Sequence, residues 1–415
     1  MSDRSAPAPA PEIPERAFER TETSSRANRL VAAAEQLISE GGVAAASARS
    51  VAVRAGAAAS AINYNFGGIE RLLSTAFERG RRRTETWLEA RRREIAALPA
   101  SSDGVVRALE YVVREWTVGA RPLALLYQEA LAAGSGAPWT ALWRDFWLEA
   151  AAGFGLGEIE GRLMHLFFES EGLYHLSTWS PALETAALRE LADHFGAVWL
   201  GASPGGVVGA LALAERSAGA HAYSALAPAA ARIAVAAAGV AEGGLGELTH
   251  RAVAARAGVT TGAITHHFRT IEELVAGAIR GQVLAISPAD GVGVEPGEQT
   301  GEAALSAEDF LGAMRFHATA DQPGGPALRR RNLFLAAVRR PELAGCAAVI
   351  RFAHGGNTRR ALERLVDLPA DALSLQAGVM SRFSAALWFA TIADAEPQES
   401  RERLFAAIAA RCFAV

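Results

Sequence analysis

Two stretches of the sequence, residues 47–73 and 249–275, carry hydroxyl, guanidinium, amide and imidazole side chains at matching positions. The first stretch reads SARSVAVRAGAAASAINYNFGGIERLL and the second reads THRAVAARAGVTTGAITHHFRTIEELV, and a constant offset of 202 aligns them without a gap. Side chains of these types donate and accept hydrogen bonds, and arginine also pairs with phosphate. The set therefore suits recognition of a nucleic acid through its backbone and its base edges.

The two stretches belong to an internal duplication. Identical pairs run through them, among them Arg54 and Arg256, Gly56 and Gly258, and Phe66 and Phe268. A weaker similarity between the two copies, at an offset of 216, pairs Met164 with Met380 and Phe167 with Phe383. The second copy is therefore about 14 residues longer, and the Gly-, Pro- and Glu-rich stretch Ser287–Asp309 predicts a loop that holds the difference.

Each copy predicts a helix, a tight turn and a second helix. Ser47 and Thr249 can cap the first helix, and Gly56 and Gly258 stand where it must end, because glycine adopts the left-handed conformation of such a corner. The second helices are expected at Ala58–Asn65 and Thr260–His267, with alanine-rich helices before each motif at Ser25–Glu40 and Ala229–Glu242, and with Ile62, Phe66, Ile264 and Phe268 in the core. This is the geometry of a helix-turn-helix, whose second helix can lie in the major groove of DNA.

The segments GAAASAINYNFGGIERLL and GVTTGAITHHFRTIEELV resemble the signature of the TetR family of bacterial transcriptional regulators. That signature runs Gly-Val-Ser, a small residue, Leu or Ile, an aromatic-His-Phe ending and Lys-Glu-x-Leu. The resemblance covers about 50 residues of each copy. It implies an all-α fold with two units, each made of an amino-terminal helix-turn-helix domain and a helical-bundle domain for sensing and dimerisation.

The resemblance also implies roles for individual side chains. Phosphate contacts are expected from Ser47, Arg49, Thr249 and Arg251. Base-edge contacts or close approaches are expected from Ser60, Asn63, Thr260, Thr261, Gly262 and Thr265. Tyr64, Asn65, His266 and His267 are expected to contact phosphate or line the groove. The alternative for each residue is a solvated surface side chain.

The sequence departs from the family signature at several positions. Ile69 and Ile271 stand where the family usually has a phosphate-binding lysine, and Asn65 replaces the usual histidine. Ala57–Ala59 gives the first recognition helix little hydrogen-bonding capacity, whereas the second begins with threonines. We therefore expect the first DNA-binding domain to hold the DNA backbone better, and the second to read base edges better.

Charge is partitioned along the chain although the net charge is only -4. Residues 26–93 hold 12 arginines and 6 acidic residues, whereas residues 94–200 hold 6 arginines and 14 acidic residues. A basic segment before an acidic one is typical of a nucleic-acid-binding head on a solvated body. No glycine-rich phosphate loop, nucleophile elbow or paired metal-ligand motif is found, so we expect neither an enzyme nor a metal or other cofactor.

The remaining composition points to the cytoplasm. No stretch is long and apolar enough to span a membrane, and the amino terminus has no apolar core of a secretory signal. Two cysteines cannot form a disulfide framework, which fits a reducing compartment. The predicted organisation, in chain order, is a disordered tail at 1–23, a DNA-binding domain at 24–80, a sensor and interface domain at 81–200, a linker at 201–224, a second DNA-binding domain at 225–281 and a second sensor and interface domain at 282–415.

Regulators of this family usually pair as homodimers through the last two helices of each protomer. Here one chain carries both units, so we expect a monomeric pseudo-dimer built from helices at Glu158–Leu176, Pro181–Leu200, Asp371–Ala393 and Pro397–Phe413. We expect a repressor that reads a non-palindromic double-stranded operator and is released by a small-molecule effector. Two alternatives stand beside it: a homodimer in which one head has lost DNA binding, and a helical ligand- or protein-binding module that no longer binds DNA.

Aromatic side chains in the two sensor domains predict either an apolar or aromatic effector pocket or simply core. The candidate lining residues are Trp116, Tyr127, Trp143, Trp147, Phe168, Phe316 and Phe334. Arginine runs at 329–331 and 339–340 predict either recognition of an anionic effector, such as an acyl-CoA, or a solvated helix face. His165 and Glu169, four residues apart, are expected to meet on one helix face, as an interface pair.

Overall fold

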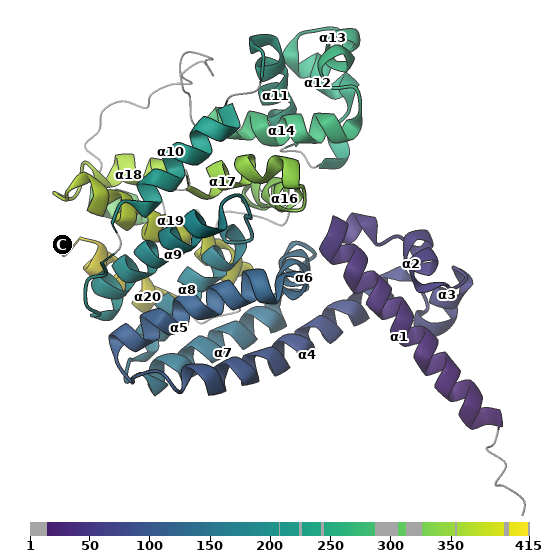
Figure 1. The fold of residues 1–415 in the computed structure, drawn as a ribbon, viewed down its shortest axis with the longest axis horizontal. Coiled ribbons are helices and arrows are strands. Elements are labelled where there is room, and N and C mark those ends of the chain that lie inside the picture. Colours follow the sequence, from purple (N-terminus) through teal and green to yellow (C-terminus); the bar gives the residue numbers. More distant parts are fainter. Residues whose placement is uncertain are drawn as a thin grey trace, which may run out of the picture. The chain divides into compact units, whose positions relative to one another are not determined.

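The computed structural model describes residues 15–206, 208–223, 226–241, 245–286, 306–312, 326–352, 355–393 and 398–413. Within these ranges every regular element is a helix, which confirms the all-α prediction (Figure 1). The chain divides into two compact units, Met1–Gly80 and Arg81–Val415. The finer division into six domains and segments remains a prediction.

The first unit is a small helical domain. Its elements are α1 (Glu15–Gly41), the single turn η1 (Val43–Ala45), α2 (Ala48–Ala55), α3 (Ser60–Phe66) and the beginning of α4 (Ile69–Ile95). Leucine, valine and isoleucine side chains from all four helices are buried together, among them Leu30, Ile38, Val51, Ile62 and Leu72. The helix α1 begins at Glu15, earlier than the predicted Ser25, while residues 1–14 of the predicted tail lie outside the described residues.

An ion pair ties α4 to α1 in this domain. The guanidinium of Arg79 donates from Nε and Nη2 to the two carboxylate oxygens of Glu35, at 2.7 and 2.9 Å. The carboxylate is nearly buried, with 8% of its side chain exposed. Two parallel hydrogen bonds fix the relative rotation of the two groups, so this pair sets how the long helices cross.

The second unit begins with a bundle that we call the first bundle. It comprises the end of α4, α5 (Ser102–Arg114), α6 (Arg121–Ala132), α7 (Ala137–Gly153), α8 (Glu158–Tyr174) and α9 (Pro181–Phe195). Wide turns at Glu115–Gly119 and Gly196–Leu200 extend α5 and α9. Proline stands in the first turn of α6, α7 and α9, where a missing backbone N–H costs nothing because that group has no partner within the helix.

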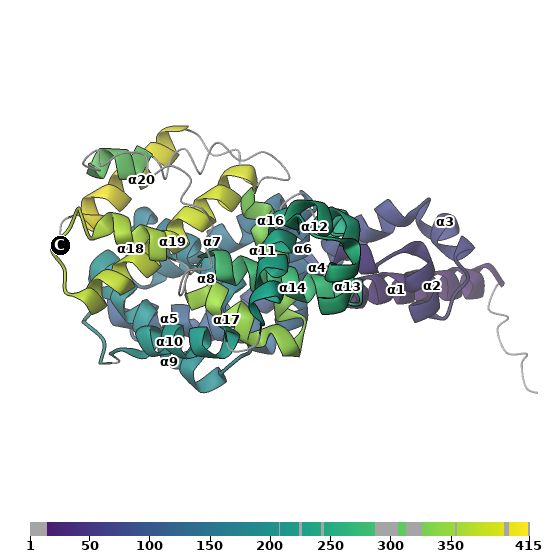
Figure 2. The ribbon, with the colours of Figure 1, turned by 90° about the horizontal axis from the view of Figure 1, so that it is seen from above.

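The predicted linker 201–224 contains a helix, α10 (Ala210–Tyr223). It packs against α9 on one side and α17 (Ala344–Phe352) on the other (Figure 2). Glu190 of α9 accepts hydrogen bonds from the backbone N–H groups of Gly209, at 2.5 Å, and Leu211, at 2.7 Å. The carboxylate therefore caps the start of α10 and fixes it to the first bundle.

A second small helical domain follows α10. It consists of α11 (Pro228–Ala241), the turn η4 (Leu245–Glu247), α12 (His250–Ala257), α13 (Thr261–His267) and α14 (Ile271–Ile286). Its two long helices, α11 and α14, approach each other closely, and a Cβ atom at Gly281 would clash with the carbonyl oxygen of Ala234. The offset of 202 aligns Gly281 with Arg79, so an ion pair in one copy is replaced by close backbone contact in the other.

The remaining helices form what we call the second bundle. They are α16 (Pro326–Val338), the turn η5 (Pro341–Leu343), α17, α18 (Gly356–Leu362), α19 (Ala370–Ala393) and α20 (Gln398–Cys412), and residues 307–312 are also helical. The predicted loop at Ser287–Asp309 lies outside the described residues up to position 305.

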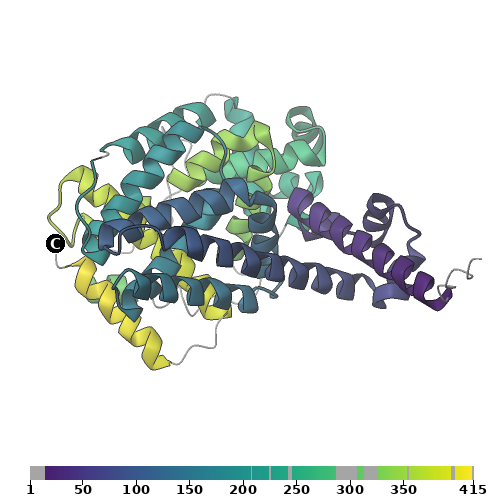
Figure 3. The same cartoon turned by 60° about the horizontal axis from the view of Figure 1, so that its bottom comes forward.

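The two bundles meet through the four helices predicted for the interface. The helix α8 packs against α19, α9 packs against α19, and α20 packs against α8 (Figure 3). Aromatic rings join them: the Phe195 and Phe383 centroids lie 6.0 Å apart, and those of Trp199 and Phe383 lie 4.9 Å apart. All of these side chains are buried, so they contribute apolar burial to the packing of one bundle on the other.

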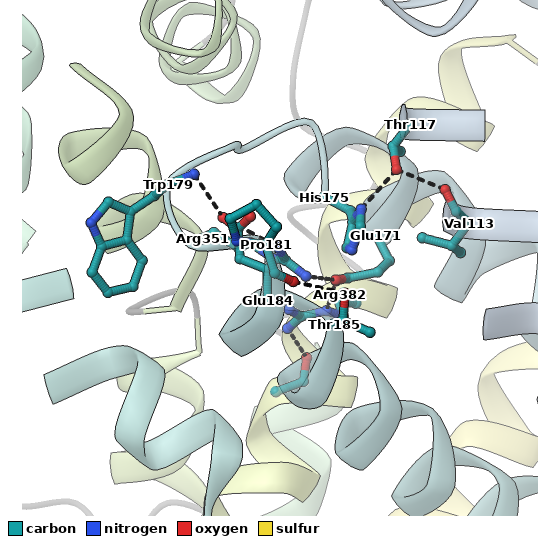
Figure 4. Close-up of polar contacts among 11 residues, drawn as sticks. Val113, Thr117, Glu171, His175, Trp179, Pro181, Glu184, Thr185, Arg351 and Arg382 are labelled. Carbon is teal, nitrogen blue, oxygen red and sulfur yellow. Dashed lines mark hydrogen bonds and ion pairs between the residues drawn. The ribbon is translucent and has the colours of Figure 1, made fainter. Parts of the chain in front are cut away.

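A charged cluster is buried in the same interface (Figure 4). The carboxylate of Glu171 accepts from Nη2 of Arg351 at 2.7 Å and from Nε of Arg382 at 2.5 Å, and all three side chains are at most 2% exposed. Burial disfavours the charged carboxylate, but Arg382 and Arg351 outweigh it and lower the pKa of Glu171 to about 2. The cluster is therefore ionised at neutral pH.

His175 lies beside this cluster, and its protonation should weaken the fold in acid. Its Nδ1 pairs with the Thr117 hydroxyl at 2.7 Å, and burial together with Arg351 lowers the pKa of His175 to about 3. Because the unfolded histidine titrates near 6.5, only the unfolded chain binds this proton between pH 6.5 and 3. Stability should therefore fall as pH drops through this window, at a limiting slope of about 1.4 kcal/mol per pH unit from this group.

The check is thermal or urea unfolding of the wild type and of His175→Leu at a series of pH values. The variant should show a shallower loss of stability between pH 6.5 and 4. His165→Leu is the control, because it removes another buried imidazole of the first bundle, one that pairs with Glu169. Equal slopes for the wild type and His175→Leu would contradict the expectation.

The close approach of α11 and α14 should make Gly281 intolerant of any side chain. In an open helix, Gly→Ala stabilises by up to about 1 kcal/mol. At Gly281 the added methyl group would strike the carbonyl of Ala234, so we expect a net loss of about 1–3 kcal/mol. Thermal unfolding followed by circular dichroism measures this, with Gly153→Ala as the matched control, because a Cβ there meets no atom within 4 Å. A Gly281→Ala melting temperature at or above that of the wild type would show that the helices can move apart.

Candidate nucleic-acid interface

The first motif is α2, a glycine corner and α3. The hydroxyl of Ser47 accepts from the backbone N–H of Ser50 at 3.1 Å and so caps α2. Gly56 ends the helix in the left-handed conformation, with φ 61°, which a residue with a Cβ adopts at a cost. Val51 and Ile62 are buried and hold the two short helices together.

The second motif repeats this geometry with its own caps. Thr249 accepts from the N–H of Ala252 at 3.1 Å, and Gly258 ends α12 with φ 65°. Thr260 caps α13 by accepting from the N–H of Ala263 at 3.2 Å, a cap that Ala59 cannot supply at the start of α3. Ile264 and Phe268 are buried as predicted, whereas Phe66 of the first motif is only half-buried.

The predicted contact residues of the first motif lie on its surface. Ser47, Arg49, Ser60, Asn63 and Tyr64 are exposed, and Tyr64 has an exposed fraction of 80%. Asn65 is half-buried, and its amide donates to the carbonyl of Ala61 at 2.7 Å. Asn65 is thus turned back onto its own helix, while Asn63 is presented to solvent.

The predicted residues of the second motif lie at the start of α12, at the start of α13 and along α13, and all but one are exposed. They are Thr249, Arg251, Thr260, Thr261, Gly262, Thr265 and His266, with His267 half-buried. The imidazoles of His266 and His267 lie edge to face, 5.0 Å apart. The hydroxyl of Thr265 donates to the carbonyl of Gly262 at 3.1 Å, so its two oxygen lone pairs and its methyl group are what it can offer to a base.

Several polar contacts in the two motifs were not predicted from the sequence. Arg54 of α2 pairs with Glu40 of α1 at 2.9 Å, and His250 pairs with the carbonyl of Phe268 at 2.8 Å. Asn63, Gly67 and Arg71 are among the residues that line a hollow at the end of α3. Arg71 stands two residues after Ile69, so it offers a cation near the place where the family has its lysine, and this spacing was the signal available in the sequence.

Both motifs have the arrangement that defines a helix-turn-helix DNA-binding domain: a capped first helix, a glycine corner and a short second helix with exposed polar residues. The family model "Bacterial regulatory proteins, tetR family" matches residues 30–76 and 233–278, which are these two domains. The chain is therefore a TetR family DNA-binding regulator with two TetR-like units. The match does not extend to the two bundles, and no curated protein matches the chain.

The side chains predicted to bind an effector are packed against one another in the first bundle. Trp116, Tyr127, Trp143, Trp147 and Phe168 are at most 1% exposed. The ring centroids of Trp143 and Phe168 lie 3.9 Å apart, and those of Trp116 and Trp143 lie 4.9 Å apart. The hydroxyl of Tyr127 donates to Glu169 at 2.6 Å, and His165 meets the same oxygen at 3.1 Å. The effector-binding role of the five aromatic side chains remains a prediction.

In the second bundle, Phe334 is buried and its ring lies 5.4 Å from that of Tyr174 in the first bundle, while Phe316 lies outside the described residues. Two arginines of the predicted runs contact the first bundle instead of forming a solvated face. Arg331 is buried and donates to the backbone and side-chain oxygens of Gln128, and Arg339 pairs with Glu129 at 2.7 Å. Neither residue supports a solvated-face interpretation of those runs.

The geometry predicts unequal roles for the two asparagines of α3. Asn63→Ala should weaken binding to the preferred DNA site about tenfold, within the ~1–3 kcal/mol that a good base contact supplies. Asn65→Ala should change it by less than about twofold, because its amide is already bonded to Ala61. Fluorescence anisotropy with a labelled duplex measures both variants, and circular dichroism checks that α3 is intact. An equal loss for the two variants would show that Asn65 leaves Ala61 to meet the DNA.

Proposed function

We propose that the chain is a repressor that closes on itself as a pseudo-dimer and occupies a non-palindromic operator. Support comes from the packing of α8 and α9 on α19 and α20 within one chain. In the homodimers that the family usually forms, the equivalent four helices come from two protomers. One polypeptide thus holds both partners of such an interface, and each partner carries its own DNA-binding domain.

The two recognition helices present different chemistry. The helix α3 exposes Ser60, Asn63 and Tyr64, whereas α13 exposes Thr261, Thr265 and His266. An amide pairs with adenine through two hydrogen bonds, whereas a threonine methyl group prefers the methyl of thymine. Two helices of unlike composition favour two unlike half-sites, about one helical turn or ~34–36 Å apart.

The proposed effector is a small apolar or aromatic molecule that carries a hydrogen-bond acceptor. The indole N–H groups of Trp116, Trp139, Trp143 and Trp147 are buried and have no acceptor among the described residues. A buried donor without an acceptor costs free energy, so a ligand oxygen in this cluster would be stabilised. Release requires that the effector bind the DNA-free form more tightly than the DNA-bound form. Unchanged operator affinity at saturating effector would refute this part of the proposal.

The proposed partners are double-stranded DNA and this effector, and the proposed location is the cytoplasm. No helix among the described residues is long and apolar enough to span a membrane. The described part of the chain also contains no cluster of three histidine, cysteine or carboxylate residues suited to a metal. The proposal depends on the two helix-turn-helix domains, and it requires neither catalysis nor a cofactor.

Selection of bound sequences from random duplex DNA with the purified chain tests the operator. We expect an asymmetric motif with two unlike half-sites. Arg49→Ala and Arg251→Ala should each reduce the slope of log affinity against log salt by about 1, without changing the selected sequence, because each removes one phosphate contact.

A palindromic motif would show instead that one head dominates and that two chains pair across the DNA. Absence of any enriched sequence would favour a ligand- or protein-binding module without DNA recognition. If one DNA-binding domain dominates, only one of the two arginine variants should change the slope of log affinity against log salt. This distinguishes that outcome from recognition by both domains.

A further inference from the structure

We infer that the interface between the two bundles selects a heterotypic partner: the first bundle fits the second and neither fits a copy of itself. The inference rests on the proposed pseudo-dimer and adds what chooses the partner. Its basis is the position of the buried ion pairs relative to the internal repeat.

The interface keeps the pseudo-symmetry expected of a duplicated dimer. The offset of 216 that pairs Phe167 with Phe383 superposes α8 on α19 and α9 on α20 in sequence. These equivalent helices also contact each other in equivalent ways, with α8 on α19, α9 on α19, and α20 on α8. In such an arrangement each contact occurs twice. Where a residue of the first copy contacts a residue of the second, the repeat equivalents of these two residues also contact each other.

The buried charges break this symmetry. Glu171 on α8 corresponds to Leu387 on α19, and Arg382 on α19 corresponds to Leu166 on α8. The ion pair between Glu171 and Arg382 is therefore mirrored by two leucines, which are also buried. One side of the pseudo-two-fold interface carries opposite charges and the other side carries apolar side chains.

A second pair at the rim breaks the symmetry in the same way. Glu160 of α8 accepts from Arg411 of α20, and the equivalent positions are Gln376 and Phe195. Gln376 contacts the first bundle beside Phe195, since its Oε1 lies 2.9 Å from Nε2 of His194. The equivalent region is thus also in contact, but an amide and a phenyl ring stand there in place of the ion pair.

Homotypic pairing would leave these charges without partners. Two first bundles would place each Glu171 against Leu166, and two second bundles would place each Arg382 against Leu387. A buried charge that has lost its partner is strongly unfavourable, because neither water nor a counter-charge replaces it. Only the heterotypic pair satisfies Glu171, Arg351 and Arg382 together.

The test leaves DNA out, so that its outcome is independent of operator recognition. A protease site inserted after Gly206, in the exposed stretch before α10, allows the folded full-length chain to be nicked after purification. Nicked protein labelled with ¹⁵N is mixed with unlabelled nicked protein in sub-denaturing urea until light and heavy halves have exchanged. Native mass spectrometry then identifies every two-fragment species.

We expect each pair to contain one first half and one second half, in light, heavy and mixed combinations. Pairs of identical halves at their statistical share, one half of all pairs, would overturn the inference. A palindromic operator or absent DNA binding would leave this result unaffected, so failure here and failure of the proposed function are distinguishable.

A variant pair tests the residue that makes the selection. Glu171→Leu gives the first bundle the residue of its repeat equivalent and removes the charge that forbids self-pairing. In the nicked Glu171→Leu protein, pairs of two first halves should rise at least fivefold over the wild type. Glu158→Leu, which removes an exposed acid from the same helix, should leave the pairing unchanged. Equal pairing in both variants would show that Glu171 does not choose the partner, and the wild-type exchange tests the inference independently if Glu171→Leu does not fold.

Discussion

The buried carboxylate of Glu171 depends on both bundles at once. It comes from α8, and its two cationic partners come from α17 and α19. A carboxylate with no exposed surface is tolerated only when opposite charges and hydrogen bonds replace water. The packing of α8 on α19 is thus what makes the charge acceptable, and the charge in turn admits only a partner that brings the two arginines. Aromatic packing around Phe383 supplies the apolar burial that holds the helices together, while the ion pairs fix which helices meet.

The helix-turn-helix domains were predictable from the sequence because their signals are local. Each motif has a capping hydroxyl (Ser47 or Thr249), a glycine corner (Gly56 or Gly258) and an apolar anchor (Ile62 or Ile264). In each motif the three lie within twenty residues of one another, so they shape a short stretch of chain. The helix α11 was predicted to within one residue at each end, whereas α1 begins ten residues before the predicted Ser25. Residues 15–24 contain no glycine or proline that would end a helix, and Pro14 directly precedes the observed start of α1.

The interface was only partly predictable. The four helices were identified from their order and from the repeat, but the arginines that pair across the interface were interpreted as a solvated face or an effector site. Arg331 and Arg339 form part of a run of positive charge, and a run of charge in a sequence does not reveal which members point inward. Their partners, Gln128 and Glu129, lie about 200 residues away, so no local pattern connects them. The same reason left Arg351 and Arg382 unassigned. For the aromatic residues the sequence allowed both core and pocket, and the packed rings around Trp143 show how the same side chains satisfy the core interpretation.

Fusion of two units in one chain changes what the sequence is free to vary. In a homodimer every substitution at a two-fold interface appears twice, so an ion pair must be compatible with its own mirror image. In a duplicated chain the two sides mutate separately, and a pair such as Glu171 with Arg382 can stand opposite Leu166 and Leu387. The same freedom applies at the two recognition helices, where Ala57–Ala59 in one copy faces no requirement to match Val259–Thr261 in the other. Asymmetry at the interface and asymmetry at the DNA-reading surface therefore have one physical origin. An interface that accepts only unlike halves also keeps one recognition helix of each kind in every closed chain, and this is the condition under which a non-palindromic operator can be read by a single polypeptide.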